Sequence, residues 1–351
     1  IFIFVGSIVL FVSSSCCHKP TEPPVLTPVE KARQFIVSQK HSGTGLIKSY
    51  AGLPSFDYSY NTAWTFDNAL VLAYWISSNI NGDLARAKDL AEEFDNLQSA
   101  NGMWANGYKV NSGAIHSQNY RVGPTATMAR AFVDLYVKTG DTEFLVAAQQ
   151  AANAILNNFF ITRYDAQNNP IYGYATIGID NGSMPQSAST EENGRVLMLF
   201  YLLSQHANNG QNENYRHSAE LIAQWLITRM WNPAGYFYAG CFGNENINYQ
   251  GALDPQLTPV FAFDLARPIL NIDPQNYNTL PFVNQFKTQV AWGDTTVRGY
   301  SYNLSVNSVW FEGTAGVMGL NYILGGTNND ELIYSLEAAQ TDNGSIYHSI
   351  G

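Results

Sequence analysis

Hydrophobic and polar residues alternate in long blocks along this chain, and one arrangement recurs five times. Residues 187–203 show it most clearly, because the polar opening SASTEEN runs into the nearly continuous apolar run GRVLMLFYLL. Ser189 or Thr190 can cap the first backbone N–H groups, which predicts that a helix starts here. The first turn of that helix would display Glu191 and Glu192. The other four copies begin at Asn61, Tyr120, Gly251 and Asn307.

The five copies are spaced almost evenly along the chain. When Asp67, Pro124, Glu191, Pro255 and Glu312 serve as markers, the successive steps are 57, 67, 64 and 57 residues. A period near sixty residues, with one apolar helix in each period, predicts a repeat architecture.

A more amphipathic helix is predicted after each apolar one. A helix that is apolar all round must be buried on every side, whereas an amphipathic helix needs only one covered face. Their alternation predicts a double ring in which outer helices wrap inner ones. We expect apolar helices over 66–78, 122–138, 191–205, 257–265 and 312–324, and amphipathic helices over 83–98, 142–158, 213–230, 280–290 and 329–339.

A further helix and six connectors complete the pattern. Thr27, Pro28 and Glu30 supply a cap, a proline at the first helical position and an acid three residues after the cap, which predicts a helix to about Gln39. Each outer helix is followed by a short segment rich in glycine and aromatic residues, which predicts a β-turn or small hairpin. The six segments are SGTGLIKSY, NGMWANGY, NNPIYGYA, PAGYFYAG, TTVRGYSY and NGSIYHSIG. Six connectors require six helix pairs, so we expect an all-α (α/α)6 toroid whose twelfth helix lies beyond Gly351.

The start of the chain differs from the rest. Residues 1–15, IFIFVGSIVLFVSSS, are mostly apolar but too few to span a membrane comfortably, which predicts the core and cleavage zone of a secretory signal. Small residues before Cys16 and Cys17 resemble a bacterial lipoprotein box, although Ser13 stands where such boxes usually carry Leu. We expect lipid attachment at Cys16, with Cys17 as the alternative.

These features predict the organisation and location of the protein. Residues 1–26 would be a leader and a proline-rich tether, and residues 27–351 would form one domain. We expect a monomer in the bacterial cell envelope, either lipid-anchored in the periplasm or on the outer-membrane surface, or secreted. Its contact with the membrane would be made only through the N-terminal anchor.

Composition narrows the classes of function. The net charge is −10 and no run of Lys or Arg occurs, which argues against nucleic-acid binding. Aromatic residues make up 13% of the chain, with 21 Tyr and 7 Trp, and such rings suit stacking on sugars as well as core packing. Cys241 is the only cysteine after the leader and is expected to be a small buried apolar residue. No metal-ligand cluster, phosphate-binding glycine loop or Ser-His-Asp spacing stands out, so we expect neither a cofactor nor a metal.

The double ring would gather acidic residues that are far apart in the sequence. Successive inner helices would run parallel, so their N-termini would open on one face. The catalytic candidates there are Asp67, Glu191, Glu192 and Glu312. Acids in a first helical turn are also common simply because they interact favourably with the helix dipole. Glu191 and Glu192 lie about 100° apart around a helix, so only one of them could point squarely into a shared cavity.

Aromatic and polar residues near the same helix starts would form the walls of this cavity. The expected substrate-binding residues are Trp64, Trp104, Tyr108, His116, Tyr120, Arg121, Tyr174, Tyr238 and Trp310. Carboxyl groups and flat aromatic faces in a concave site are what glycoside hydrolysis requires, with one carboxylic acid, one carboxylate and a surface for the sugar.

Several segments resemble those of the bacterial six-hairpin, (α/α)6-toroid glycosidases. They are TFDNALVLAYW, GDLARAKDL, TGDTEFLVAA, SASTEEN and WFEGTAGVMGL, and the resemblance covers most of residues 27–351. Relatives of this type often read Ser-Thr-Glu-His-Asn, so Glu191 matches their acid and Glu192 stands where a His is expected. The resemblance implies a carbohydrate-active enzyme acting on an oligo- or polysaccharide.

Three other functions remain open on the residues alone. A sugar epimerase would use histidines as proton carriers, and His116 and His348 are expected on the cavity side. A polysaccharide lyase would need a Tyr or His base beside an Arg, and His116, Tyr120 and Arg121 offer that set. A glycan-binding surface lipoprotein would need only the aromatic residues. A glycoside hydrolase with paired carboxyl groups is the favoured interpretation.

Overall fold

The structure of the protein, a computed structural model, describes residues 26–207, 210–326 and 328–351. The predicted signal segment, together with Cys16 and Cys17, lies outside the described residues.

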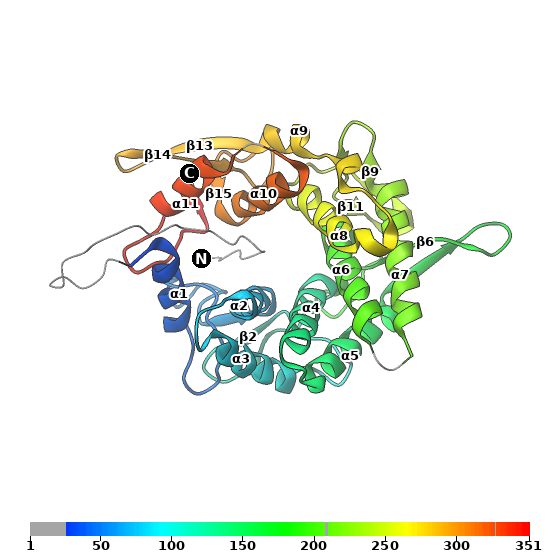
Figure 1. Ribbon diagram of the computed structural model, residues 1–351, viewed down its shortest axis with the longest axis horizontal. Coiled ribbons are helices and arrows are strands. Elements are labelled where there is room, and N and C mark those ends of the chain that lie inside the picture. Colours follow the sequence, from blue (N-terminus) through cyan, green and yellow to red (C-terminus); the bar gives the residue numbers. More distant parts are fainter. Residues whose placement is uncertain (1–25, 208–209, 327) are drawn as a thin grey trace.

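Five helices surround the centre of the molecule and form an inner layer (Figure 1). They are α2 (Thr65–Ser77), α4 (Val122–Thr139), α6 (Thr190–His206), α8 (Asp254–Leu270) and α10 (Phe311–Leu324). Each packs against the next inner helix along the chain. Apolar side chains occupy most of their circumference, as the sequence predicts, and Ser189 caps α6 by accepting a hydrogen bond from the Glu192 N–H.

A second layer of helices lies outside the first (Figure 1). It consists of α1 (Pro28–Ser38), α3 (Asp83–Leu97), α5 (Thr142–Asn158), α7 (Asn212–Trp225), the short α9 (Leu280–Val283) and α11 (Asp330–Ala338). The predicted capping box starts α1, because the Thr27 hydroxyl accepts from the Glu30 N–H and the Glu30 carboxylate accepts from the Thr27 N–H. The first and last parts of the ring touch, since the Gln340 side chain donates to the Pro28 carbonyl at 2.9 Å. The all-α double ring of eleven helices is thus confirmed over the described residues.

The core lies between the two layers. Phe132 of α4 meets Phe144 of α5 with ring centroids 5.6 Å apart, and Phe200 of α6 stacks on Tyr215 of α7 at 5.9 Å. All four side chains are fully buried. Burial of such a large side chain stabilises the fold by roughly 1.5–3 kcal/mol, so these contacts hold each inner helix to its outer partner.

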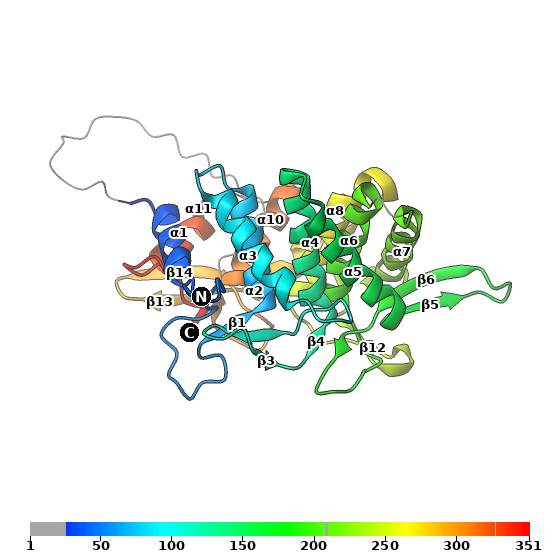
Figure 2. The same cartoon turned by 90° about the horizontal axis from the view of Figure 1, so that it is seen from below.

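Short antiparallel sheets connect the helices. Three strands make one sheet, β1 (Thr62–Trp64), β2 (Gly107–Lys109) and β3 (Ile115–Ser117), and three make another, β8 (Ala188–Ser189), β11 (Gly240–Cys241) and β12 (Ile247–Asn248). The pairs are β4 (Tyr120–Arg121) with β7 (Gly178–Ile179), β5 (Phe160–Tyr164) with β6 (Pro170–Ala175), β9 (Trp231–Asn232) with β10 (Tyr236–Phe237), β13 (Lys287–Trp292) with β14 (Thr295–Tyr300), and β15 (Val309–Trp310) with β16 (Ser349–Ile350). Figure 2 shows β1, β3, β4 and β12 on one face of the ring.

One predicted helix is largely replaced by other structure. The prediction over 280–290 is wrong beyond the four-residue α9, because a 3₁₀ turn (Asn284–Phe286) and the β13–β14 hairpin follow it. Residues 287–292 alternate between exposed and half-buried positions, which is the period of a strand. Gly293, with φ of +55°, makes the tight turn between the two strands.

Candidate active site

A buried polar side chain ties each of four inner helices to the connector segment beside it. In α6, the Asn193 side chain accepts from the Ala175 N–H at 2.7 Å and donates to the carbonyls of Ala175 and Ser189, both at 2.9 Å. The same tie joins Asn68 to Ile47, Gln256 to Phe237 and Thr314 to Tyr300. Each tie also reaches the carbonyl four residues earlier in its own helix, so it fixes where the helix begins relative to the connector.

The acidic residues occupy two positions relative to these four tie residues, Asn68, Asn193, Gln256 and Thr314. Glu191, Asp254 and Glu312 stand two residues before a tie residue, whereas Asp67 and Glu192 stand one residue before. The marker residues of the repeat therefore occupy two different structural positions. Pro255 marks its copy of the repeat, and Asp254, which directly precedes it, is not among the predicted catalytic residues.

A cavity of about 450 Å³ lies at the starts of α2, α4 and α6. Three of the four predicted catalytic acids line it, namely Asp67, Glu191 and Glu192. Glu312 belongs to the same group of charges, since it interacts electrostatically with both Asp67 and Glu191. The remaining lining residues are Tyr50, Ser59, Trp64, Phe66, Asn106, Arg121, Gly123, Pro124 and Arg195.

Arg195 is the central cation of this group. Its Nη2 donates to Glu191 Oε1 at 2.7 Å, and its guanidinium carbon lies 4.4 Å from the centroid of the Phe66 ring. Asp254 and Glu312 are close enough to interact with its charge. Arg195 thus links the start of α2 with the start of α6.

Glu192 is held by a different cation. Arg121 Nη2 lies 2.9 Å from Glu192 Oε1, while Glu192 Oε2 is buried and has no hydrogen-bond partner within the described part of the chain. Burial raises the pKa of Glu192 to about 7, against the opposing effect of the Arg121 charge. Gly123 admits this side chain, because a Cβ built on Gly123 would come within 2.6 Å of Glu192 Cγ.

Asp67 differs, because no arginine or lysine of the described residues pairs with it. No ion pair involving Asp67 is formed with the described residues, and its buried Oδ2 accepts no hydrogen bond from them. Burial raises the pKa of Asp67 to about 7, with the neighbouring Ser49 hydroxyl acting in the opposite direction. A carboxyl group in this state carries a proton close to neutral pH.

Asp254 and Glu312 also favour the neutral form. Burial raises the pKa of Asp254 well above its usual value, and the charges of Glu191 and Glu312 raise it further. Burial likewise raises the pKa of Glu312, and Asp67 adds to the effect. The site thus places Glu191, in a close ion pair with Arg195, beside several carboxyl groups that resist ionisation.

The predicted sugar-binding residues divide into two groups. Trp64 and Arg121 line the cavity, and the His116 ring lies 6.0 Å from that of Trp64. The expectation is wrong for Trp104, Tyr108 and Tyr174, which are at most 2% exposed and belong to the core.

Hydrogen bonds and packing explain these three core positions. The Trp104 indole donates to the Phe94 carbonyl, the Tyr108 hydroxyl bonds to the Leu97 carbonyl, and Tyr174 stacks on Trp225. Neighbouring residues of a strand point to opposite faces, and these three point inward.

Three further predicted residues lie away from the cavity lining. Trp310 is 6% exposed and packs edge-on against Tyr302, so it is part of the core rather than the wall. Tyr120 is half-buried against the hydrophobic core. Tyr238 is half-buried with its hydroxyl accepting from Asn232 at 2.8 Å.

Asp254, Arg195, Phe66 and Tyr50 are among the residues of the site that were not predicted from the sequence. Alignment of the copies on Asn68, Asn193 and Gln256 would have found Asp254 and Phe66, which share the position of Glu191. Arg195 carried a signal as well, since it follows Glu191 by four residues, the spacing of a helical ion pair. Tyr50 lies in a connector that ends in a loop and carried no such signal.

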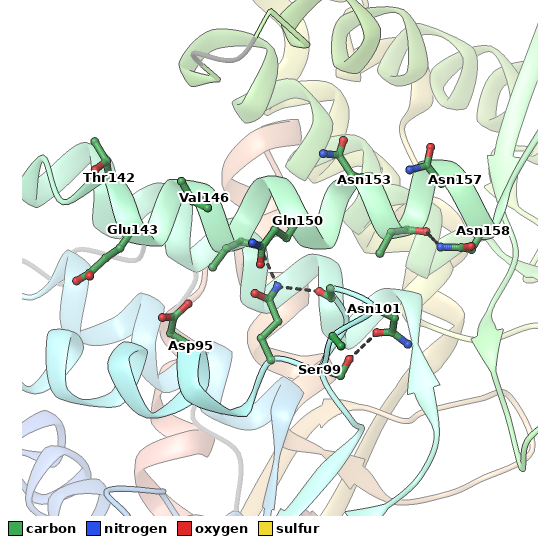
Figure 3. A pocket seen from close by; sticks show the side chains of 15 residues that line it. Asp95, Ser99, Asn101, Thr142, Glu143, Val146, Gln150, Asn153, Asn157 and Asn158 are labelled. Carbon is green, nitrogen blue, oxygen red and sulfur yellow. Dashed lines mark hydrogen bonds between the residues drawn. The ribbon is translucent and has the colours of Figure 1, made fainter.

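A larger groove lies on the outside of the ring, between α3 and α5 (Figure 3). It has a volume of about 920 Å³ and is lined mainly by amide and hydroxyl side chains, including Asn101, Gln150, Asn153 and Asn157. Figure 3 shows Gln150, Asn153 and Asn157 along α5, and Asn101 opposite them in the loop after α3. Its two carboxylates, Asp95 and Glu143, stand on separate helices without a cation among the lining residues, so it lacks the charge arrangement of the inner cavity.

Three other features bear on the predictions. Cys241 is buried in β11, as expected. Among the described residues, no three His, Cys, Asp or Glu side chains are arranged to hold a metal ion. None of the helices in the described ranges has the length and apolar character needed to cross a bilayer.

The fold is that of known carbohydrate-active enzymes. A family 76 glycoside hydrolase from a bovine Bacteroides thetaiotaomicron strain superposes with a TM-score of 0.66 at 11% identity, over 91% of this chain and 70% of that chain. A family 76 mannosidase from Bacteroides thetaiotaomicron gives 0.63 at 11% identity, over 90% and 89% of the two chains. Cellobiose 2-epimerase from Bacillus thermoamylovorans gives 0.64 at 11% identity, over 92% and 91%. No protein-family model and no curated protein matches the sequence. The likeness shows the (α/α)6-toroid fold of the six-hairpin glycosidases.

Proposed function

We propose that this protein is a glycoside hydrolase that cleaves a neutral glycan with two of the clustered carboxyl groups. The observation that carries the proposal is the cavity at the starts of the inner helices, where an ion-paired carboxylate lies among carboxyl groups that favour the neutral form. Glycoside hydrolysis needs both states at once, one to protonate the leaving oxygen and one to act as base or nucleophile.

Glu191 is the carboxylate in this proposal. It lines the cavity and pairs with Arg195 through Oε1. The guanidinium group of Arg195 and the positive end of the α6 helix dipole both lie beside this side chain. Glu191 would therefore activate water or attack the sugar directly.

Asp67 is the general acid. Four carboxyl groups of this site have a raised pKa, but Glu192 is engaged by Arg121, and Asp254 and Glu312 do not line the cavity. Asp67 lines it, and burial raises its pKa to about 7. A general acid works best when its pKa lies near the working pH, so this environment suits proton donation.

The cavity walls suit a neutral sugar. Trp64 and Phe66 present aromatic surface, and Tyr50 and Asn106 add polar groups of the kind that hydrogen-bond sugar hydroxyls. Both guanidinium groups of the lining, those of Arg121 and Arg195, already pair with glutamates. An anionic sugar would have to displace one of these pairs.

The same contacts weigh against the alternative reactions. A lyase would use Arg121 to bind a sugar carboxylate, but Arg121 is paired with Glu192, and Tyr120 packs against the core. An epimerase would need histidines at the reacting carbon, but neither His116 nor His348 lines the cavity.

The proposal predicts that Asp67→Asn and Glu191→Gln each lower turnover at least about 100-fold, the usual contribution of an acid or base group. The relatives of similar fold act on mannosides and on cellobiose, so mannan and cello-oligosaccharides are the first substrates to examine. Release of reducing ends measures hydrolysis, and affinity electrophoresis measures binding of the same glycans.

Glu143→Gln is the matched control. Glu143 also occupies the first turn of a helix, but of the outer helix α5, where it lines the outside groove. It should leave turnover unchanged. Full activity of either cavity variant would exclude that residue from the proposed role. Glycan binding without any product would indicate a binding protein, and an unsaturated product that absorbs ultraviolet light would indicate a lyase.

A further inference from the structure

The loop that precedes β1 exposes several aromatic side chains. Phe56 is 89% exposed, Tyr58 61% and Tyr60 42%. Figure 2 shows this blue loop projecting from the face on which β1, β3 and β4 lie. Exposed aromatic residues that gather in one segment commonly mark a binding surface.

Tyr58 is held in place although it is exposed. Its ring centroid lies 4.5 Å from the His116 ring and 5.8 Å from the Trp64 ring. His116 Nε2 donates to the Tyr58 carbonyl at 2.7 Å, and the next residue, Ser59, donates its N–H to Asp57 Oδ1 at 2.7 Å. Contacts on both the ring and the backbone therefore restrain Tyr58 before any ligand arrives.

Trp64 is fixed as well. Gly107 of β2 pairs with it, and a Cβ at Gly107 would come within 2.7 Å of the Trp64 ring. The absence of a side chain at Gly107 lets the indole lie directly on the strand. A ring that is already immobile loses little conformational entropy when a ligand stacks on it.

The aromatic group is continuous with the cavity. Trp64 and Ser59 both line the cavity, and Tyr58 directly precedes Ser59 in the chain and contacts Trp64 with its ring. A glycan that leaves the carboxyl groups past Trp64 would therefore meet Tyr58 next.

We propose that Tyr58, Trp64 and His116 form a distal sugar-binding subsite that receives a unit of the glycan beyond the cleaved bond. This inference rests on the proposed function and extends it, because it makes the substrate an oligo- or polysaccharide longer than the cavity. The C–H face of the sugar would stack on the aromatic rings, and the Tyr58 hydroxyl is available at their edge for a sugar hydroxyl.

Chain-length dependence distinguishes a subsite from simple packing. Tyr58→Ala is expected to raise KM about five- to ten-fold for long mannan and cello-oligosaccharides, as the loss of one aromatic contact would. The same variant should leave KM for the disaccharides and all kcat values unchanged. Tyr58→Phe, which keeps the ring but lacks the hydroxyl, should raise KM for the long glycans less than Tyr58→Ala does.

Tyr322→Ala is the matched control, because Tyr322 is 86% exposed but lies in the last turn of α10, far from that helix's start. It should change nothing. Equal KM values for Tyr58→Ala and the unmodified protein on long glycans, or an equal rise on disaccharides, would overturn the subsite.

A binding measurement separates this inference from the proposed chemistry. In affinity electrophoresis through gels that contain mannan or hydroxyethyl cellulose, the unmodified protein should be retarded and Tyr58→Ala less so. Retardation that depends on Tyr58, together with full activity of Glu191→Gln, would retain the subsite and reject the assigned carboxylate. An unmodified protein that neither binds nor cleaves either glycan would overturn the subsite.

Discussion

Asp67 stands in the first turn of α2, where two effects act on its charge in opposite directions. The dipole of the helix favours the carboxylate by roughly 0.3–1 kcal/mol, which is less than one pKa unit. Burial favours the neutral acid and raises the pKa of Asp67 to about 7. Desolvation therefore exceeds the dipole effect at this position, and the same residue type at an exposed helix start would stay ionised.

The raised pKa of Asp67 predicts how stability changes with pH. The folded protein retains a proton that the unfolded chain releases near pH 4, so the stabilisation is complete below about pH 4 and is lost as pH rises to about 7. Asp67→Asn, which cannot ionise, should reduce the loss of unfolding free energy between pH 5 and pH 8. Over this window the reduction has an upper limit of about 3 kcal/mol. Urea unfolding at the two pH values measures it.

Asp264→Asn provides the comparison for this measurement. Asp264 lies on α8 and is exposed, so its replacement should leave the pH dependence as it is in the unmodified protein. The raised pKa values of Glu192, Asp254 and Glu312 are present in both variants, so some decrease in stability with pH should remain. If Asp67→Asn and Asp264→Asn gave the same pH profile, burial of Asp67 would be weaker than we infer.

Single acids were easier to predict than single aromatic residues. Asp67, Glu191 and Glu192 line the cavity because a helix start points in one known direction, and the periodicity identifies the helix. Trp104, Tyr108 and Tyr174 lie in or beside short strands, where side chains alternate between the two faces. In so short a strand, no local pattern indicates which face meets the core.

At the scale of the elements, the buried side chain that ties each connector determines where an inner helix begins. Asn193 forms hydrogen bonds with one backbone N–H and two backbone carbonyl groups at the start of α6. The unpaired polar groups left by its loss would each cost about 1–3 kcal/mol. This tie also positions Glu191, which lies two residues earlier in the same turn.

Asn193→Asp tests the tie with little change of shape. The carboxylate can still accept from the Ala175 N–H, but it cannot donate to the carbonyls of Ala175 and Ser189 and would face their oxygen atoms. We expect a loss of about 2–4 kcal/mol in the free energy of unfolding. The same change at Asn157, which is exposed near the end of α5, should cost less than about 1 kcal/mol. Denaturant unfolding compares the two, and equal losses would mean that the tie is not important.

The fifth helix pair shows where the prediction of elements reached its limit. Residues 280–290 contain apolar residues at intervals that fit a helix, but Thr288 and Val290 are β-branched and alternate with exposed neighbours. Pairing with residues 295–300 adds a full ladder of backbone hydrogen bonds to this strand. The hydrophobic pattern within residues 280–290 carries no information about a strand that pairs with them from beyond a turn. The sequence therefore did not predict this hairpin.

At the scale of the whole molecule, the ring explains how residues as distant in sequence as Asp67 and Glu312 come to share one electrostatic environment. The inner helices are parallel and each contributes its first turn to the same face. The double ring was predictable because it needs only the alternation of two helix types. The sequence did not predict which acids lie close to Arg195, because this depends on the rotation of each helix about its own axis.

Contact between the first and last parts of the chain closes the outer layer, and Gly344 is its tightest point. Gly344 has φ of +89°, and a Cβ there would lie 2.1 Å from the carbonyl oxygen of Lys31 in α1. Backbone atoms cannot yield as a flexible side chain can, so Gly344→Ala must push α1 away from residues 340–345. Positive φ alone costs an alanine about 1–2 kcal/mol.

Gly325→Ala isolates the contribution of this contact. Gly325 also has positive φ, +66°, but no atom lies within 4 Å of the point that an alanine Cβ would occupy there, so its replacement should cost only the backbone term. Gly344→Ala should cost at least about 1–3 kcal/mol more, the usual penalty for overpacking. Hydrogen exchange should also speed up in α1 with Gly344→Ala and not with Gly325→Ala, since α1 would lose its neighbour. Equal unfolding free energies for the two variants would show that the ends of the ring are not held together at this point.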